Sequence, residues 1–266
     1  MVSGTSGPAR LEAGGSASKT ADVALARVSV AGGVPKGNRL LLTGQACGMH
    51  SFEPPAETLA DVVLVDYGLG NLRSAARGLE RAGAAVEITD DPEAFAAADG
   101  VVLPGVGAFR EGMENAGPLR AALTDHAAAG RPLFGICLGM QMLLTSSEEA
   151  DHEGEGEVTG LDLIPGTNVR FDVDRKVPHM GWNELAVERD HPLVAGVDGD
   201  HAYFVHSYYA EPDDPAAVVA TADYGVDFPA VVANDAGNVF GTQFHPEKSG
   251  ETGLRILRNF VEYCAD

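Results

Sequence analysis

The chain of 266 residues is long enough for one or two domains, and it is strongly acidic, with a net charge of −21 at pH 7. This charge argues against nucleic-acid binding, which requires a basic surface. No segment approaches the ~20 apolar residues of a membrane span. Cys47, Cys137 and Cys264 form neither a disulfide framework nor a Cys-x-x-Cys metal pair, so we predict a reducing, cytoplasmic location.

The N-terminal stretch differs in composition from the rest of the chain. Residues 1–48 are rich in Gly, Ala and Ser and hold five basic and two acidic residues, a net charge of +3 that leaves −24 for residues 49–266. We therefore predict that residues 1–58 are disordered or a non-native extension, with Met49 a candidate start, and that residues 59–266 form one domain. A targeting peptide is the alternative, although the apolar run 40–42 is too short for secretion.

The domain is predicted to work at high salt. Residues 49–266 carry 37 acidic and 13 basic residues, and their only lysines are Lys176 and Lys248. Such a charge causes strong self-repulsion at low ionic strength, which concentrated salt screens. We expect a halophilic cytoplasm. Acidity from a disordered segment is the alternative, although the charges are spread among apolar runs.

Alternating apolar runs and helical patterns in the first half predict an α/β domain. Such alternation indicates parallel strands with helices on both faces, and continuous apolar runs favour central strands. The expected strands are 62–65, 85–88, 101–103 and 133–136, and the expected helices are 72–82, 118–129 and 138–144.

The second half predicts mixed and antiparallel strands. We expect a hairpin over 230–243 that turns at Asn-Asp-Ala-Gly-Asn, residues 234–238, and a closing helix at 253–264. Ligands in such folds bind at strand ends, so the catalytic groups should lie there. The other expected strands are 169–171, 184–187, 202–209 and 217–221.

Cys137 lies in Gly-Ile-Cys-Leu-Gly, residues 135–139, where a predicted strand gives way to a helix. A side chain on such a turn is held in a strained, exposed elbow, and glycines flank it because a Cβ would collide there. The first N–H groups of the helix favour the thiolate, which is the reactive form. A lone cysteine is more often a small core residue. The motif therefore indicates a nucleophile only if a base is found elsewhere in the chain.

A candidate base follows in Gly-Thr-Gln-Phe-His-Pro-Glu, residues 241–247. A nucleophilic cysteine needs a group that takes its proton and returns it to the leaving group, and this base needs a partner that fixes its tautomer. His245 and Glu247 fit these two roles. An ordinary exposed loop is the alternative for His-Pro-Glu alone, but its occurrence together with the cysteine motif favours catalysis.

A glycine-rich loop, Leu-Pro-Gly-Val-Gly-Ala-Phe at residues 103–109, follows another apolar strand. Such a loop can turn backbone N–H groups toward a developing oxyanion, and we expect Val106 and Leu138 to supply the donors. A phosphate cradle is the alternative, but no Gly-Lys-Ser/Thr follows. The eight histidines include no His-Glu-x-x-His pair, so we expect no metal and no cofactor.

These three motifs, in this order, resemble the class I glutamine amidotransferases, a Cys-His-Glu family that hydrolyses glutamine to release ammonia. The resemblance covers about residue 61 to the end. Segments 66–74, 177–183, 203–209 and 246–250 are similar to the glutaminase subunits of imidazole glycerol phosphate synthases. The resemblance implies a three-layer α/β fold with a central, mostly parallel sheet, helices on both faces and mixed or antiparallel strands in the C-terminal half.

The resemblance also implies a role for each motif residue. Cys137 attacks the glutamine carboxamide, His245 protonates the departing ammonia, Glu247 orients His245, and water hydrolyses a glutamyl thioester. The implied binding residues for the rest of glutamine are Gly107, Gln141, Glu149, Ser207 and Tyr208. The alternatives are that Glu148 and Glu149 form a solvated helix end and that Ser207 and Tyr208 only pack in a sheet.

A synthase partner is implied as well, a (β/α)₈ barrel that forms a heterodimer with this chain. It would use the ammonia to form imidazole glycerol phosphate and an aminoimidazole carboxamide ribotide in histidine biosynthesis, and it would activate the glutaminase by setting the loop at Gly105 and Val106. The alternatives are a subunit of another amidotransferase, such as anthranilate synthase, and a non-catalytic regulatory module. Trp182 is an interface anchor or a core residue; the implied interface residues are Asn71, His179, Trp182 and Lys248.

Overall fold

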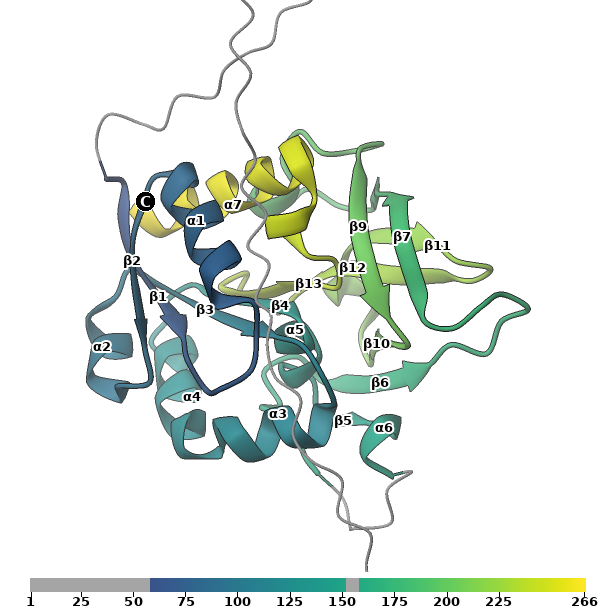
Figure 1. The fold of residues 1–266 in the computed structure, drawn as a ribbon, viewed down its shortest axis with the longest axis horizontal. Coiled ribbons are helices and arrows are strands. Elements are labelled where there is room, and N and C mark those ends of the chain that lie inside the picture. The colour runs from purple at the N-terminus through teal and green to yellow at the C-terminus, as the bar shows by residue number, and fades with distance from the viewer. Residues whose placement is uncertain (1–57, 152–157) are drawn as a thin grey trace, which may run out of the picture. The chain divides into compact units, whose positions relative to one another are not determined.

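An eight-stranded sheet forms the centre of the computed structural model, which describes residues 58–151 and 158–266 (Figure 1). The strands are β1 (Ala60–Val65), β2 (Ala84–Thr89), β3 (Gly100–Gly105), β4 (Leu133–Cys137), β8 (Ala186–Val187), β11 (Val218–Asp223), β12 (Asp227–Ala233) and β13 (Val239–Thr242). Their order is β2-β1-β3-β4-β13-β12-β11-β8. The first five strands are parallel, and the last three are added antiparallel.

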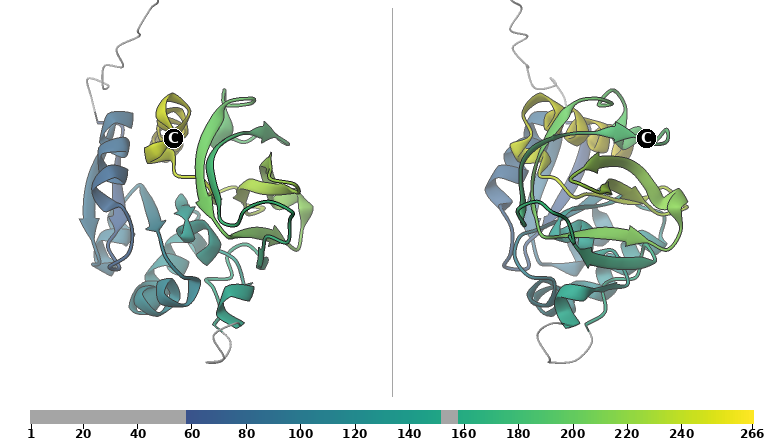
Figure 2. Two further views of the ribbon diagram at one scale, coloured as in Figure 1. Left: turned by 45° about the vertical axis from the view of Figure 1, so that its right-hand side comes forward. Right: turned by 90° about the vertical axis from the view of Figure 1, so that its right-hand side faces the viewer.

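Helices cover both faces of the sheet, as Figures 1 and 2 show. On one face lie α1 (Leu72–Ala82) and α7 (Gly250–Ala265), whose Leu79 and Phe260 belong to one apolar core. On the other lie α2 (Pro92–Ala97), α3 (Phe109–Ala116) and α4 (Arg120–Ala128), which contribute Phe95, Phe109 and Leu123 to a second core. Among the described residues, no helix is both long and apolar enough to cross a membrane.

Two small sheets lie at the right of Figure 1, on the side of the antiparallel strands. One consists of β10 (Tyr208–Pro212), β6 (Gly166–Arg170) and β5 (Ser146–Ser147), and the other pairs β7 (His179–Glu184) with β9 (His201–His206). The remaining helices are α5 (Leu138–Met142), α6 (Glu148–Asp151) and short 3₁₀ turns at Gly117–Leu119, Pro192–Val194, Pro215–Ala217 and Pro246–Lys248.

Much of the predicted architecture is confirmed. The mostly parallel sheet, the helices on both faces, the bounds of α1 and the hairpin from β12 to β13 agree with the sequence. One prediction was wrong: β2 is an edge strand, and only its first residue is buried. The prediction for residues 1–58 lies outside the described residues, apart from Thr58, and stays a prediction.

Other differences have local causes. The helix after Cys137 ends at Met142 instead of Leu144, because the carbonyls of Met142, Leu143 and Leu144 accept from the N–H groups of residues 161–164. The single strand expected at 202–209 is two strands, since the chain leaves the β7–β9 pair at Ser207 and joins β6 as β10. The structure adds α2, which Asp91 caps by accepting from the Glu93 N–H at 3.0 Å.

Candidate active site

Cys137 forms a strained elbow at the end of β4. Its backbone has φ 55° and ψ −108°, a combination outside the regions that residues with a side chain ordinarily adopt. A Cβ on Gly139 would lie 1.8 Å from the Leu103 carbonyl oxygen, and one on Gly135 would lie 2.7 Å from the Gly139 backbone. The two glycines therefore allow the chain to double back from β4 into α5 against β3. The predicted strand-to-helix bend at Cys137 is present.

His245 and Glu247 form a buried pair beside this elbow. Strands β13 and β4 are parallel neighbours, so the segment after β13 reaches the same edge of the sheet as Cys137. His245 Nδ1 donates to Glu247 Oε1 at 3.0 Å, and the two side chains are only 2% and 3% exposed. With Nδ1 bound to the carboxylate, Nε2 is the atom left for proton transfer.

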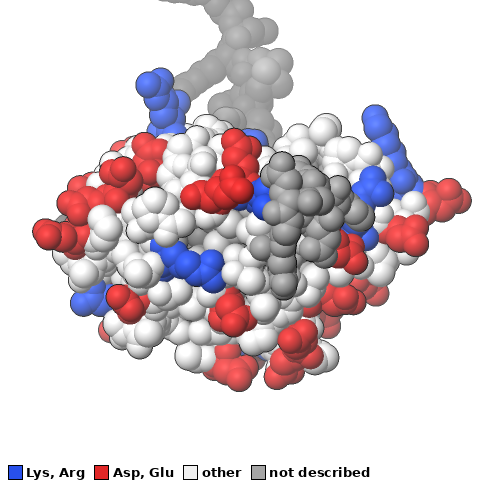
Figure 3. All heavy atoms as spheres, turned by 90° about the horizontal axis from the view of Figure 1, so that it is seen from below, with Lys and Arg blue, Asp and Glu red and all other residues white. Residues whose placement is uncertain are grey.

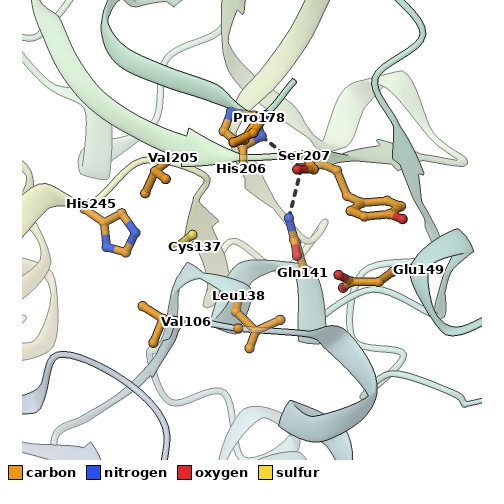
Figure 4. Close-up of a pocket in the computed structure, with 12 residues that line it drawn as sticks. Val106, Cys137, Leu138, Gln141, Glu149, Pro178, Val205, His206, Ser207 and His245 are labelled. Carbon is orange, nitrogen blue, oxygen red and sulfur yellow. Dashed lines mark hydrogen bonds between the residues drawn. The ribbon is translucent and has the colours of Figure 1, made fainter. Parts of the chain in front are cut away.

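The charges around His245 favour its protonated form. Burial lowers the pKa of His245, but Cys137 and Glu247 outweigh burial and raise the pKa to about 9. The imidazole lies next to the sulfur at one end of the pocket (Figure 4), although Nε2 makes no direct hydrogen bond within the described part of the chain. Catalytic hydrogen bonds commonly shorten only when substrate is bound. The arrangement therefore places a protonated imidazole next to the Cys137 sulfur.

A pocket of about 290 Å³ opens above Cys137, a size that suits a small molecule. In Figure 4, His245 lies on one side of Cys137 and Glu149 on the other. The pocket contains both predicted oxyanion residues and all five predicted binding residues. Its lining comprises Val106, Gly107, Cys137, Leu138, Gln141, Glu149, Pro178, Val205, His206, Ser207, Tyr208 and His245.

Two side chains at the Glu149 end are held by the backbone of other elements. Glu149 Oε2 accepts from the Phe109 N–H at 2.8 Å, which fixes the carboxylate at the start of α3. Gln141 Nε2 donates to the Tyr208 carbonyl at 3.0 Å. Glu149 is thus part of the pocket wall, whereas the exposed Glu148 points elsewhere and accepts from the Arg170 N–H at 2.8 Å.

Comparison with known proteins assigns the family. The model for "Glutamine amidotransferase class-I" matches residues 63–264. Relatives named imidazole glycerol phosphate synthase subunit HisH, from Halobacterium salinarum and Natronomonas pharaonis, are 78% and 76% identical over 207 residues, which cover 78% of this chain and 95% and 96% of theirs. The chain belongs to the HisH family.

The fold of a solved relative agrees with this membership. A crystal structure of a glutamine amidotransferase superposes with a TM-score of 0.60 at 22% identity, covering 77% of this chain and 99% of that one. At this identity the likeness shows the fold alone. The class I amidotransferase fold expected from the motifs is therefore confirmed, and so is the resemblance to the HisH subunits.

The expected interface residues of this HisH-family chain divide into two groups. Trp182 is 56% exposed on β7, so it is not a core residue, and Asn71 and Lys248 are exposed as well. His179 is only 3% exposed and packs between the rings of Phe204 and Tyr224. The expectation that His179 faces a partner is corrected, because alternate residues of a strand point to opposite faces.

Sequence reasoning missed residues in and next to the pocket. His206, which lines the pocket, donates from Nδ1 to the Tyr208 carbonyl at 2.9 Å, and burial lowers the pKa of His206 to about 3, so the ring is neutral. Gln243 is completely buried and contacts the sulfur of Cys137. Its position inside the motif 241–247 was the available signal, but only the neighbouring strands show what its amide contacts.

Proposed function

We propose that this chain hydrolyses glutamine to glutamate and ammonia through a thioester on Cys137, and passes the ammonia to a synthase subunit that makes imidazole glycerol phosphate and an aminoimidazole carboxamide ribotide in histidine biosynthesis. One observation carries the proposal. The strained Cys137 elbow and the buried His245–Glu247 pair meet in one pocket whose far end holds a carboxylate.

The first half-reaction forms the thioester. The Cys137 thiolate attacks the carboxamide carbon, a C–S bond forms, and the carbonyl electrons move onto the oxygen. The backbone N–H groups of Val106 and Leu138, which line the pocket, are the proposed donors to this oxyanion. When the C–N bond breaks, the imidazolium of His245 gives its Nε2 proton to the departing nitrogen, so that neutral ammonia leaves.

The second half-reaction restores the enzyme. His245, now neutral, takes a proton from a water molecule that attacks the thioester carbon. The C–S bond breaks, glutamate leaves, and the thiolate and imidazolium are formed again. Glu247 holds the imidazole through Nδ1 in both half-reactions. One histidine thus acts as acid in the first half-reaction and as base in the second.

Glu149 is proposed to bind the other end of glutamine. Its carboxylate lies in the pocket on the side of Cys137 away from His245. A carboxylate is suited to the α-ammonium group, because hydrogen bonds between charged groups are the stronger ones. Gln141, Gly107, Ser207 and Tyr208 complete the wall around the amino-acid end.

The synthase partner is proposed to bind at the exposed edge of the site. Met180 and Trp182 alternate along β7 and are 62% and 56% exposed, which gives the described part of the chain an apolar patch of the kind found at interfaces. Asn71 and Lys248 are the proposed polar contacts. Val106, 38% exposed, connects the oxyanion loop to solvent, so a partner can set that loop. The purified subunit alone is then expected to be nearly silent.

The proposed setting is a cytoplasm with high salt. In Figure 3, acidic side chains are spread over the visible face with few basic ones between them. The similarity to relatives from haloarchaea agrees with this distribution. Screening by molar salt relieves the repulsion between such charges.

A reconstitution experiment tests the function. The chain is mixed, in molar potassium chloride, with the synthase subunit from the same organism. Glutamate formation is then measured with and without the ligand that the synthase subunit binds. We expect turnover only in the complex, and none with Cys137→Ala. Turnover with an anthranilate synthase subunit instead, or no turnover with any partner, would point to the alternatives. The HisH relatives disfavour both.

A further inference from the structure

Gln243 is a buried amide placed beside the nucleophile. Its side chain is 0% exposed, and its backbone N–H donates to the Ala230 carbonyl of β12 at 2.9 Å. It follows β13 directly and precedes His245 by two residues. The strand exit that delivers the base therefore also delivers this amide.

Neighbouring hydrogen bonds fix the orientation of the amide. The Tyr208 carbonyl can only accept, so the Gln141 group 3.0 Å from it is the nitrogen Nε2. The same nitrogen lies 3.1 Å from Gln243 and therefore faces the oxygen Oε1 of that side chain. The Gln243 nitrogen Nε2 is then left to face Cys137, and it donates to the sulfur at 3.8 Å.

We propose that Gln243 stabilises the thiolate of Cys137 by donating a hydrogen bond to the sulfur, as a second group beside His245. The proposal rests on the assignment of Cys137 as the nucleophile. Gln243 belongs to the same motif as His245, residues 241–247, and contacts the sulfur without changing its own protonation state.

The direction of the effect follows from the two forms of sulfur. A thiol is a weak acceptor, whereas a thiolate carries a full charge, and hydrogen bonds to charged groups are roughly twice as strong as neutral ones. Gln243 is fully buried, so water does not replace the bond when it is lost. Removing the donor should therefore destabilise the thiolate more than the thiol.

The same amide connects the sulfur to the opposite wall of the pocket. Cys137, Gln243, Gln141 and the Tyr208 carbonyl form one chain of hydrogen bonds. Because Gln141 and Tyr208 line the part of the pocket proposed for the amino-acid end, the sulfur and that wall share one rigid support. The position of the sulfur then depends on the amide as well as on its own backbone.

The test measures the pH at which Cys137 becomes reactive. The full chain in molar potassium chloride is treated at a series of pH values with iodoacetamide, a reagent for thiolates. The modified Cys137 peptide is followed by mass, which distinguishes it from the peptides that contain Cys47 and Cys264. Gln243→Met keeps the size of the side chain without its donor. Gln243→Glu keeps the shape and the acceptor for Gln141 but replaces the donor with an acid. Melting curves establish that each variant is folded.

Thr242→Val is the matched control. It removes a buried hydroxyl from the same segment, one that donates to the Phe244 carbonyl at 3.1 Å instead of to the sulfur. We expect the midpoint of the reactivity profile to move up by about one pH unit in Gln243→Met, to move up in Gln243→Glu, and to stay in place in Thr242→Val.

An unchanged midpoint in either folded Gln243 variant overturns the proposal, as does an equal shift in Thr242→Val. The reactivity midpoint and glutamine turnover are measured separately, so failure of this proposal can be distinguished from failure of the proposed glutaminase function. An unchanged midpoint with normal glutamine turnover in the complex removes only the role of Gln243. If the midpoint shifts in the Gln243 variants but the wild-type complex does not hydrolyse glutamine, the glutaminase function is removed and the hydrogen bond stays in place.

Discussion

Glu247 Oε1 lies 3.0 Å from His245 Nδ1, and neither side chain is more than 3% exposed. The carboxylate therefore sets the tautomer of the imidazole and, together with Cys137, favours its protonated form, with little competition from solvent. The proton transfer proposed at Nε2 depends on this pair. The predictions below begin with it and extend outward to the elbow and the pocket.

Replacing Glu247→Gln should leave an oxygen that accepts from Nδ1 but remove the negative charge. We expect the glutaminase kcat of the complex to fall by roughly 10²–10⁴-fold, because the imidazolium that protonates ammonia is no longer stabilised. Steady-state glutamate formation measures the loss. Glu251→Gln, at an exposed position in the first turn of α7, is the control and should retain full activity.

The pKa of His245 should depend on Cys137. The value of about 9 reflects burial, which lowers it, and the effects of Cys137 and Glu247, which raise it. In Cys137→Ser the sulfur that raises the His245 pKa is absent, so this pKa should fall. An NMR titration of the His245 ring compares the two proteins, and an unchanged value would show that the sulfur does not act on the imidazole.

This pKa also sets a pH window for stability. The raised folded pKa exceeds the ordinary histidine value of 6.5, so the stabilisation is fully present below about pH 6.5 and is lost as the pH rises through about 9. The free energy of unfolding, measured by denaturant titration at several pH values, should fall over this interval. The fall should be smaller in Cys137→Ser.

Gly139 should tolerate no side chain. A Cβ there would lie 1.8 Å from the Leu103 carbonyl oxygen, which is backbone of β3 and cannot rotate away. Gly139→Ala should lower the free energy of unfolding by about 3 kcal/mol or more. Gly117→Ala, where a Cβ would meet nothing within 4 Å, should have almost no effect. Equal stability of the two variants would contradict the close approach of α5 to β3.

Much of the site was predictable because its chemistry lies in short motifs. The glycines at 135 and 139 indicated the reversal at Cys137, and the i, i+2 spacing of His245 and Glu247 indicated a base with its orienting group. The contact of Gln243 with the sulfur was not predictable, because it depends on β13 lying beside β4, and these strands are about a hundred residues apart in sequence.

The less accurate predictions concern residues whose burial is decided by the sheet. An apolar sequence does not show that β2 has a neighbour on one side only. His179 and Trp182 stand in one motif, but their places on opposite faces of β7 became clear only from its pairing with β9. Local patterns give the elements, whereas the order of strands decides which faces are exposed.

Glu149 should control affinity for glutamine. Glu149→Gln removes the charge proposed to bind the α-ammonium group, so KM in the complex should rise by roughly 10- to 100-fold with a smaller change in kcat. Glu148→Gln is the matched control, since that carboxylate accepts from the Arg170 N–H at the surface. If both variants raise KM equally, the α6 helix is disturbed and the assignment of Glu149 is wrong.

Labelling with a glutamine-like electrophile tests the central claim most directly. The complex with the synthase subunit is treated with a chloroketone analogue of glutamine, and the modified peptide is identified by mass. We predict one adduct, on Cys137, that forms at a saturating rate, is suppressed by glutamine, and slows sharply in Glu247→Gln. An adduct on another residue, or labelling of Cys137 that glutamine fails to suppress, would contradict a glutaminase site at Cys137.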